Sequence, residues 1–254
     1  MEKKSILDKI MKARVRRYLN NCYSLDIIDR CTGLWSLEDE FALTYEDHGI
    51  ERITFFARDW EGVDRLLKLV DHRESYLEFM TKDPEEYIPT GSALTGRMMR
   101  LSNPDCRIVF ENSSPVLQYR DSLIGEKADA TQVHDINDVL WKTFHTEISH
   151  LLYDEELESR INQFTIHKKG DQIDAILQAE VMPKKFYINQ IINKGEKKII
   201  HAMLLNRLEE YINQGGKYLY AWVEDRNIAS RKFHDKYGMK HDGMWNMVYQ
   251  LEYT

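Results

Sequence analysis

The sequence contains few residues that cross-link or interrupt a chain. Among 254 residues there are three cysteines, five prolines and 12 glycines. Cys22, Cys31 and Cys106 are odd in number and lack CxxC spacing, which argues against a disulfide framework or a zinc site. We therefore expect reduced thiols in a cytoplasmic protein. With few Gly and Pro, ordered helices and strands should dominate.

The sequence also lacks long apolar runs and an excess of positive charge. No stretch approaches the ~20 apolar residues that span a bilayer, and the basic segment 1–20 does not have the pattern of a signal peptide. We expect that segment to be a solvated amphipathic helix, with a membrane-surface helix as the alternative. The net charge of −7 argues against nucleic-acid binding and biases association toward cationic partners such as small amines.

The composition that is present is that of a globular protein. Hydrophobic residues make up 43%, including 14 tyrosines and five tryptophans, and the length allows one large domain or two ordinary ones. Of the nine histidines, the closest pair is His145 and His150, five residues apart, and no HExxH is present. We expect no metal site.

The second half of the chain alternates clearly between helix and strand patterns. Apolar spacing predicts a helix over 133–152, followed by a charged helix or turn. A hairpin should turn at Lys169-Gly170-Asp171. The later elements are a strand at 185–193, a helix ended by Gly215 and Gly216, a strand at 217–225, a short helix ended by Gly238, and a closing strand.

The first half contains a fainter copy of this order. A strand at 53–62 ends at a glycine, as 186–195 does, and 75–83 resembles 217–225. The segment 111–130 between the halves is punctuated by Asn, Ser, Pro and Gly. We predict two domains, at 1–120 and 121–254.

One turn in the second half has the features of an anion site. The strand at 185–193 leads into a helix through "NKGEKK", residues 193–198. Unsatisfied amides at a helix start suit a phosphate or pyrophosphate. Gly195 allows close approach of the ligand, and the neighbouring lysines add complementary charge. Taken alone, an ordinary helix start with solvated lysines is the commoner explanation.

The next strand ends in "EDRNIASRKFHDKYGMK", with Asn227, Ser230 and Gly238-Met239 at set intervals. Together with the turn above, this order resembles the GNAT superfamily of N-acetyltransferases over about 130–254. Three departures from the family pattern stand out. Ile192 replaces the usual Arg or Gln at the start of the pyrophosphate turn, and Lys197 replaces its second small residue. His234 stands where the family usually carries a general-acid Tyr.

The resemblance implies a mixed α/β (α+β) fold of tandem GNAT-like domains, each a central, mostly antiparallel sheet flanked by helices. Strands 186–192 and 218–223 would splay apart and hold the pantetheine arm of acetyl-CoA through their main chains. The cofactor-binding residues would be Ile191, Ile192, Asn193, Lys194, Gly195, Glu196, Lys197, Lys198, Asn227, Ser230 and Phe233.

The implied reaction needs an acid and a base. A lysine-like amine titrates near ~10.4, so a base must help to supply its neutral form. Glu180 and Glu224, near strand ends, are the candidates, with solvated surface carboxylates as the alternative. Either His234 or Tyr237 would protonate the departing thiolate, unless His234 is an ordinary helix-surface histidine.

The N-terminal copy lacks this chemistry. Asp59 and Glu61 stand in its turn, where they would repel a pyrophosphate. We expect a degenerate, cofactor-free N-terminal half and a C-terminal half that transfers acetyl to a small-molecule or peptide amine. The alternative function is a non-catalytic module that binds acyl-CoA or a protein partner.

Overall fold

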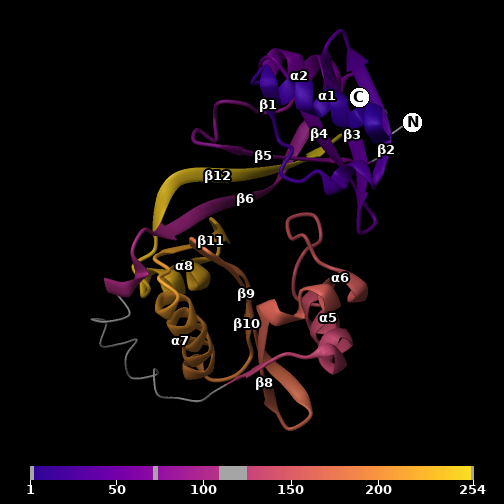
Figure 1. The fold of residues 1–254 in the computed structure, drawn as a ribbon. Coiled ribbons are helices and arrows are strands. Elements are labelled where there is room, and N and C mark those ends of the chain that lie inside the picture. The colour runs from indigo at the N-terminus through magenta and orange to yellow at the C-terminus, as the bar shows by residue number, and fades with distance from the viewer. Residues whose placement is uncertain (1–2, 71–73, 109–124, 253–254) are drawn as a thin grey trace. The chain divides into compact units, whose positions relative to one another are not determined.

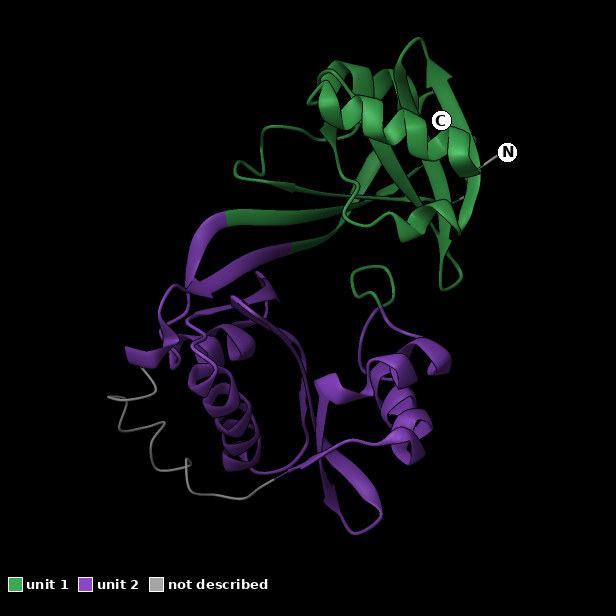
Figure 2. Ribbon diagram, in the orientation of Figure 1, with its two compact units in different colours: residues 1–97, 146–150, 244–254 green, residues 98–145, 151–243 purple. Residues whose placement is uncertain are grey.

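The chain divides into two compact units, shown in different colours in Figure 2. The computed structural model describes residues 3–70, 74–108 and 125–252. Unit 1 comprises 1–97, 146–150 and 244–254, and unit 2 comprises 98–145 and 151–243. No helix in the described ranges is long and apolar enough to cross a membrane.

Unit 1 is a helix-flanked sheet with strand order β2-β3-β4-β5-β12 (Figure 1). Apolar faces of two helices cover it: Ile6 and Ile10 of the first helix and Val63 and Leu66 of the second are buried. Its elements are α1 (Lys3–Val15), β1 (Leu19–Asn20), a 3₁₀ turn (Asp26–Ile28), β2 (Cys31–Leu37), β3 (Glu40–Asp47), β4 (Ile50–Ala57), α2 (Trp60–Leu67) and β5 (Tyr76–Thr81).

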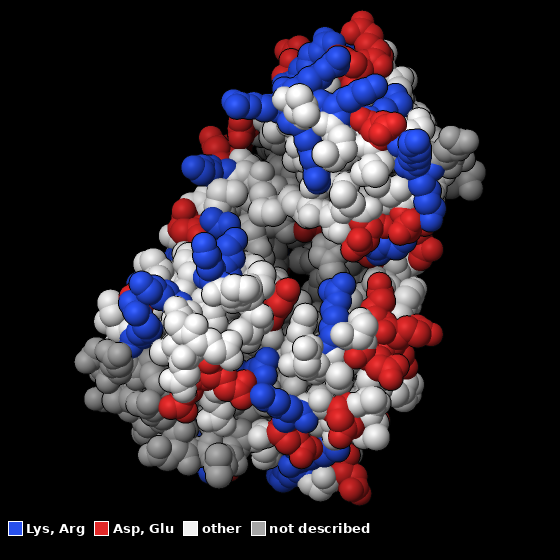
Figure 3. Space-filling model, in the orientation of Figure 1, with Lys and Arg blue, Asp and Glu red and all other residues white. Residues whose placement is uncertain are grey.

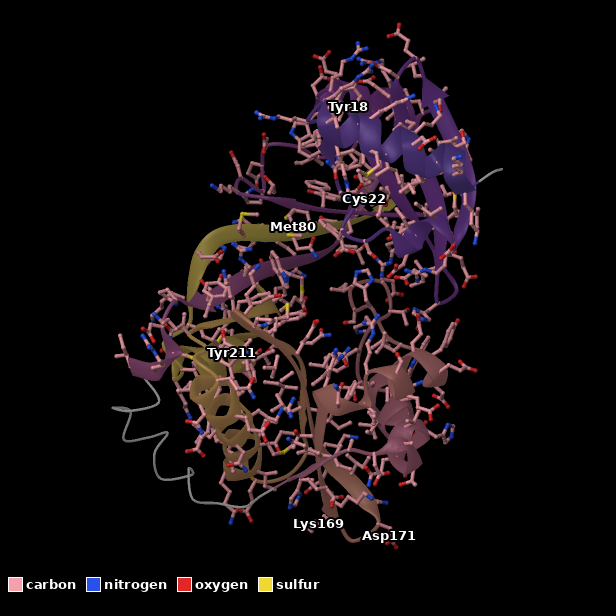
Figure 4. All side chains as sticks on the ribbon, in the orientation of Figure 1. Tyr18, Cys22, Met80, Lys169, Asp171 and Tyr211 are labelled. Atoms are coloured by element: carbon pink, nitrogen blue, oxygen red, sulfur yellow. The ribbon has the colours of Figure 1, made fainter. Side chains whose placement is uncertain are left out.

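Unit 2 has the strand order β6-β11-β10-β9-β8-β7 (Figure 1). The tip of its β8–β9 hairpin carries Lys169 and Asp171 (Figure 4). Its helices are α5 (Val133–Trp141), α6 (Asp154–Ser159), α7 (Lys197–Asn213) and α8 (Ile228–Asp235), with 3₁₀ turns at Ala130–Gln132 and Ile161–Gln163. Its strands are β7 (Glu126–Lys127), β8 (Phe164–Lys169), β9 (Gln172–Met182), β10 (Lys185–Asn193) and β11 (Tyr218–Glu224).

Two long strands each contribute residues to both units. β6 (Ser92–Asn103) pairs through 98–103 with β11, antiparallel, in unit 2. β12 (Lys240–Leu251) pairs through 245–250 with β5, antiparallel, in unit 1. Each sheet is therefore completed by a strand from the other half of the sequence.

The structure confirms the predicted fold class: mixed, mostly antiparallel sheets flanked by helices. The predicted strand at 185–193 and the hairpin turn at Gly170 are also confirmed. The predicted boundary near residue 120 lies in 109–124, outside the described residues.

The predicted helix over 133–152 is wrong in its second half. α5 ends at Trp141, and the hydroxyl of Thr143 donates to the Val139 carbonyl at 2.7 Å, a local bond that competes with helix continuation. Residues 146–150 instead belong to unit 1, where the Arg52 guanidinium donates to the carbonyl of Thr146 at 3.0 Å. Helical spacing alone did not reveal this tertiary contact.

Candidate functional site

In unit 2, the parallel strands β10 and β11 pair over part of their length. Their register runs from Lys185 opposite Tyr218 to Ile188 opposite Ala221. No described pair joins their later residues, and β10 shifts register against β9 between Ile188 and Gln190. Diverging strands present backbone amides and carbonyls that an extended ligand can pair with, as an added strand would.

The chain leaves β10 through an exposed turn that starts α7. Asn193 shapes this turn: its Oδ1 accepts from the Gly195 amide at 3.3 Å and its Nδ2 donates to the Glu196 carbonyl at 3.4 Å. Glu196 is the N-cap, and within this described segment no side chain caps the helix. The first amides of α7 are thus available to an anion.

Three exposed lysines and one half-buried carboxylate, that of Asp174, set the charge around this turn. Lys194, Lys197 and Lys198 are exposed, and Lys198 pairs with Glu196 at 3.0 Å. A Cβ at Gly195 would lie 2.7 Å from Asp174 Oδ2 and 2.9 Å from Ile199 Cδ1, so a larger residue would have to displace these side chains. Asp174 is itself paired with His167 at 2.5 Å. The turn therefore keeps a basic exterior.

The side chain of Ile192, predicted to start the pyrophosphate turn, points into the core. It is 6% exposed and packs with Val133 and Ile136 of α5. Its side chain cannot reach a cofactor, and its backbone alone is available. Ile191 is half-buried. A hydrophobic residue at this position follows from its place in the core.

The second motif lies at the start of α8. Asn227 is the N-cap, and its Oδ1 accepts from the Ser230 amide at 3.0 Å. His234, one turn later, is 3% exposed, so it is a buried residue and the surface alternative is wrong. Its Nδ1 lies 2.8 Å from the Ser230 carbonyl and 3.3 Å from the Ser230 hydroxyl.

The hydrogen bond to Ser230 fixes the tautomer of His234. A carbonyl can only accept, so Nδ1 carries the proton and Nε2 keeps its lone pair. Burial lowers the pKa of His234 to about 4, so the ring is neutral at pH 7. Nε2 is buried and has no hydrogen-bond partner among the described residues. A buried, unsatisfied acceptor is costly unless a ligand supplies its partner.

The hydroxyl of Tyr237 already has a partner inside the unit. Tyr237 is 2% exposed, and its hydroxyl lies 2.7 Å from Nδ1 of His201 on α7. Burial, with the charges of Lys236 and Lys197, lowers the pKa of His201 to about 4. Phe233 stacks on His201 at 4.8 Å and meets His234 edge-on at 5.3 Å. These residues form a packed aromatic cluster between α7 and α8.

Sequence reasoning missed His201 because it lies inside a helix with no motif around it. The neighbouring Ile199, Ile200 and Met203 made 196–213 a simple amphipathic helix. A polar residue on the buried face of α7 was the one signal that could have found it.

The two candidate bases lie apart from this cluster in the described contacts. Glu180, near the end of β9, and Glu224, the last residue of β11, are half-buried. No described contact joins either carboxylate to His234 or Tyr237. Glu180 is opposite Tyr187 of β10 in register, and Glu224 is opposite Met98 of β6.

Unit 1 contains a matching pair of parallel strands, but its gap is filled by the chain itself. β4 and β5 pair at Arg52–Tyr76 and Ile53–Leu77, and β1 then runs beside the end of β4. The buried amide of Asn21 donates to the carbonyls of Ile53 at 2.9 Å and Glu78 at 2.7 Å, and its oxygen accepts from the Phe55 amide at 2.8 Å. One side chain thus satisfies both diverging strands.

The start of α2 in unit 1 is likewise occupied by carboxylates. Asp59 caps the helix by accepting from the Gly62 amide at 2.7 Å. Buried Glu40 accepts from the Arg58 amide at 2.7 Å. The anion position of this helix is therefore held by the chain's own groups, in contrast to α7.

Solved structures similar to this chain have the GNAT fold, whereas no family model and no curated protein matches the sequence. A GCN5-related N-acetyltransferase from Sphaerobacter thermophilus has a TM-score of 0.56 at 10% identity, covering 84% of this chain and 76% of the other. A tandem GNAT protein from the clavulanic acid biosynthesis pathway has a TM-score of 0.56 at 9% identity, with coverage of 84% and 78%. A GCN5-related N-acetyltransferase from Kribbella flavida has a TM-score of 0.54 at 9% identity, with coverage of 98% and 70%.

Proposed function

We propose that this chain, which has the GNAT fold, is an N-acetyltransferase whose unit 2 binds acetyl-CoA and transfers its acetyl group to a primary amine. The parting of β10 and β11 next to the uncapped start of α7 is the observation that carries the proposal. The open strand edges suit the amides of a pantetheine arm, and the helix start suits a pyrophosphate.

The residues around the gap have separate tasks in this proposal. The first amides of α7 bind the pyrophosphate, and Lys197 and Lys198 add positive charge beside them. Asn227 and Ser230 hold the start of α8 and, through Ser230, the tautomer of His234. Phe233 and Tyr237 keep the imidazole of His234 in a packed, water-poor environment.

His234 acts as the proton carrier. Its neutral Nε2 accepts the proton that the attacking amine loses and returns it to the departing sulfur, so the ring is neutral before and after the transfer. This differs from the sequence-based expectation of a resting acid, because a group with a pKa of about 4 is not protonated at pH 7. The hydroxyl of Tyr237, bound to His201, supports the cluster.

Unit 1 binds no cofactor in this proposal. Asn21 occupies the position between diverging strands that the pantetheine arm takes in unit 2, and Glu40 with Asp59 occupies the anion position. Displacing them would leave buried donors and acceptors unpaired. Each chain therefore carries one acetyl-CoA site.

A thiol-release assay with a panel of primary amines tests the proposal. Acetyl-CoA and an accepted amine should yield one free thiol for each N-acetyl product, and the rate should depend on both substrates. Binding of acetyl-CoA with no release for any amine would instead support the non-catalytic acyl-CoA-binding module.

A further inference from the structure

A row of half-exposed side chains crosses the face of the unit 2 sheet that lies opposite α7. Phe186 of β10 contacts Tyr211 of α7 at 5.5 Å, so Tyr187, the next residue, points to the other face. In register, Tyr187 is opposite Glu180 on β9 and opposite Tyr220 on β11. Directly opposite residues share a face, so these three side chains lie together.

The row presents aromatic rings beside negative charge. The rings of Tyr187 and Tyr220 stack at 4.7 Å with an angle of 10°, and Trp222 follows on the same face of β11. The carboxylate of Glu180 has no hydrogen bond or ion pair among the described contacts. Burial raises the pKa of the Tyr220 hydroxyl, and the negative charge of Glu180 raises it further. Its charge therefore acts on this surface.

Lys185, two residues before Tyr187 on β10, adds one exposed cation to this face, against the two carboxylates of Glu180 and Glu224. Arg100 of β6 lies over the Trp222 ring at 5.8 Å and pairs with Asp242 at 2.8 Å, which balances its charge. Glu224 lies on the same face as Trp222 and is half-buried. A cation placed here would meet ring faces and carboxylates together, both of which attract it.

The position of the row connects it to the proposed reaction. Tyr187 and Tyr220 directly precede Ile188 and Ala221, the last paired residues before β10 and β11 part. A ligand on the two rings would lie beside the opening between the strands. The amine to be acetylated has to reach that opening from the side that the cofactor does not occupy.

We propose that the row of Glu180, Tyr187, Tyr220 and Trp222, the cation platform, binds the acceptor, and that the acceptor is a cationic alkylamine with apolar carbon around its nitrogen. This rests on the proposed function. The rings contact the alkyl carbons and the ammonium charge, and the Glu180 carboxylate holds the ammonium until it releases one proton to water. The neutral amine then attacks the thioester, and His234 carries its second proton to the departing sulfur.

Choline and its neutral carbon isostere, 3,3-dimethylbutan-1-ol, test the platform by ligand-observed NMR titration of the full chain without acyl-CoA. Choline should bind at least about tenfold more tightly than the isostere. Tyr220→Leu and Glu180→Gln should each weaken choline binding about fivefold or more, whereas Asp171→Asn at the β8–β9 tip should leave it unchanged. Circular dichroism checks that the variants are folded.

Equal binding of choline and the isostere, or unchanged choline binding in Glu180→Gln, would overturn the platform. Because Glu180→Gln preserves side-chain shape, it separates lost charge from lost packing. The titration contains no acyl-CoA, so its failure would leave the cofactor site untouched. Loss of acetyl-CoA binding with choline binding intact would reject the transferase and keep the platform.

Discussion

At the scale of single residues, the proposed role of His234 depends on an atom that has no partner among the described residues. Its Nδ1 is committed to the Ser230 carbonyl, and Nε2 is buried without a described partner. The sequence placed a histidine at the family's tyrosine position, but it could not show burial or tautomer. Both depend on how α8 packs against the rest of unit 2.

Replacing His234 should reduce catalysis more than binding. His234→Phe keeps the ring volume and removes Nε2, so kcat for amine acetylation should fall at least about 10²-fold with little change in acetyl-CoA affinity. His134→Asn, on the exposed face of α5, is the control and should retain full activity. Steady-state kinetics measures kcat, and calorimetry measures the affinity for acetyl-CoA. An unchanged kcat in His234→Phe would remove the residue from the mechanism.

Asn21 should contribute strongly to the stability of unit 1. Asn21→Ala leaves the Phe55 amide and two strand carbonyls unpaired in a buried site, so the free energy of unfolding should drop by about 2 kcal/mol or more. Asn213→Ala, at the exposed end of α7, should change it by less than about 0.5 kcal/mol. Urea unfolding of the two variants measures both changes in unfolding free energy. Equal losses would mean that the three hydrogen bonds of Asn21 contribute little to stability.

At the scale of elements, local patterns predicted β10, α7 and β11 well, because each has an apolar face. The prediction of α8 relied on Asn227 at its start and Gly238 after its end. The β2–β3 hairpin was not predicted, and α5 is shorter than its spacing indicated. Residues 146–150 pack on unit 1, where Ile148 lies close to Gly96. Contacts between segments so distant in sequence leave no local signal in one chain.

The start of α7 should control affinity for acetyl-CoA. Reversing the charge of both lysines, Lys197→Glu with Lys198→Glu, places carboxylates beside the pyrophosphate, and affinity should fall at least about tenfold at low salt. Lys4→Glu with Lys12→Glu, at exposed positions of α1 in unit 1, changes the net charge by the same amount outside unit 2 and should have little effect. Calorimetric titration with acetyl-CoA at two salt concentrations measures the affinity of each variant. Equal losses of affinity in both variants would indicate a general effect of net charge.

At the scale of the whole molecule, acidic and basic side chains are interspersed on the visible surface of each unit (Figure 3). Unit 1 also contains a charge cluster in which Asp47, Arg52 and Glu78 are largely buried, and the half-exposed ring of His150 bonds to both carboxylates. Burial alone would lower the pKa of His150, but Glu78 and Asp47 raise it to about 9. In unit 2, by contrast, the pKa values of His201 and His234 are lowered to about 4.

These opposite shifts predict a loss of stability at both ends of the pH range. The ion pairs of protonated His150 contribute their full stabilising free energy below the ordinary histidine pKa of about 6.5. This contribution is lost as pH rises through about 9. His201 and His234 stay neutral in the fold, so stability falls as pH drops from about 6.5 toward 4, by up to about 1.4 kcal/mol per pH unit for each.

Urea unfolding at pH 5, 7 and 9.5 checks both limbs. His234→Phe should roughly halve the slope of the acidic limb, since His201 remains, and leave the alkaline limb unchanged. His150→Asn should remove the alkaline limb and leave the acidic limb unchanged. Stability that is constant between pH 5 and 7 would contradict the assignment of neutral, buried histidines.

The exchange of β6 and β12 between the units is the feature that sequence could least predict. Both strands have ordinary strand patterns, and nothing in either shows which sheet it completes. The tandem order was visible in the sequence, whereas the filling of one gap and not the other depends on Asn21 and Glu40, residues far from the recognisable motifs.

The central claim is that each chain holds one acetyl-CoA, in unit 2. Calorimetric titration of the full chain with acetyl-CoA tests it most directly. One equivalent should bind per chain to the wild type and to the Lys4→Glu, Lys12→Glu double variant, whereas the Lys197→Glu, Lys198→Glu double variant should lose most of that affinity. No heat at high micromolar concentration, or two equivalents per chain, would contradict the account.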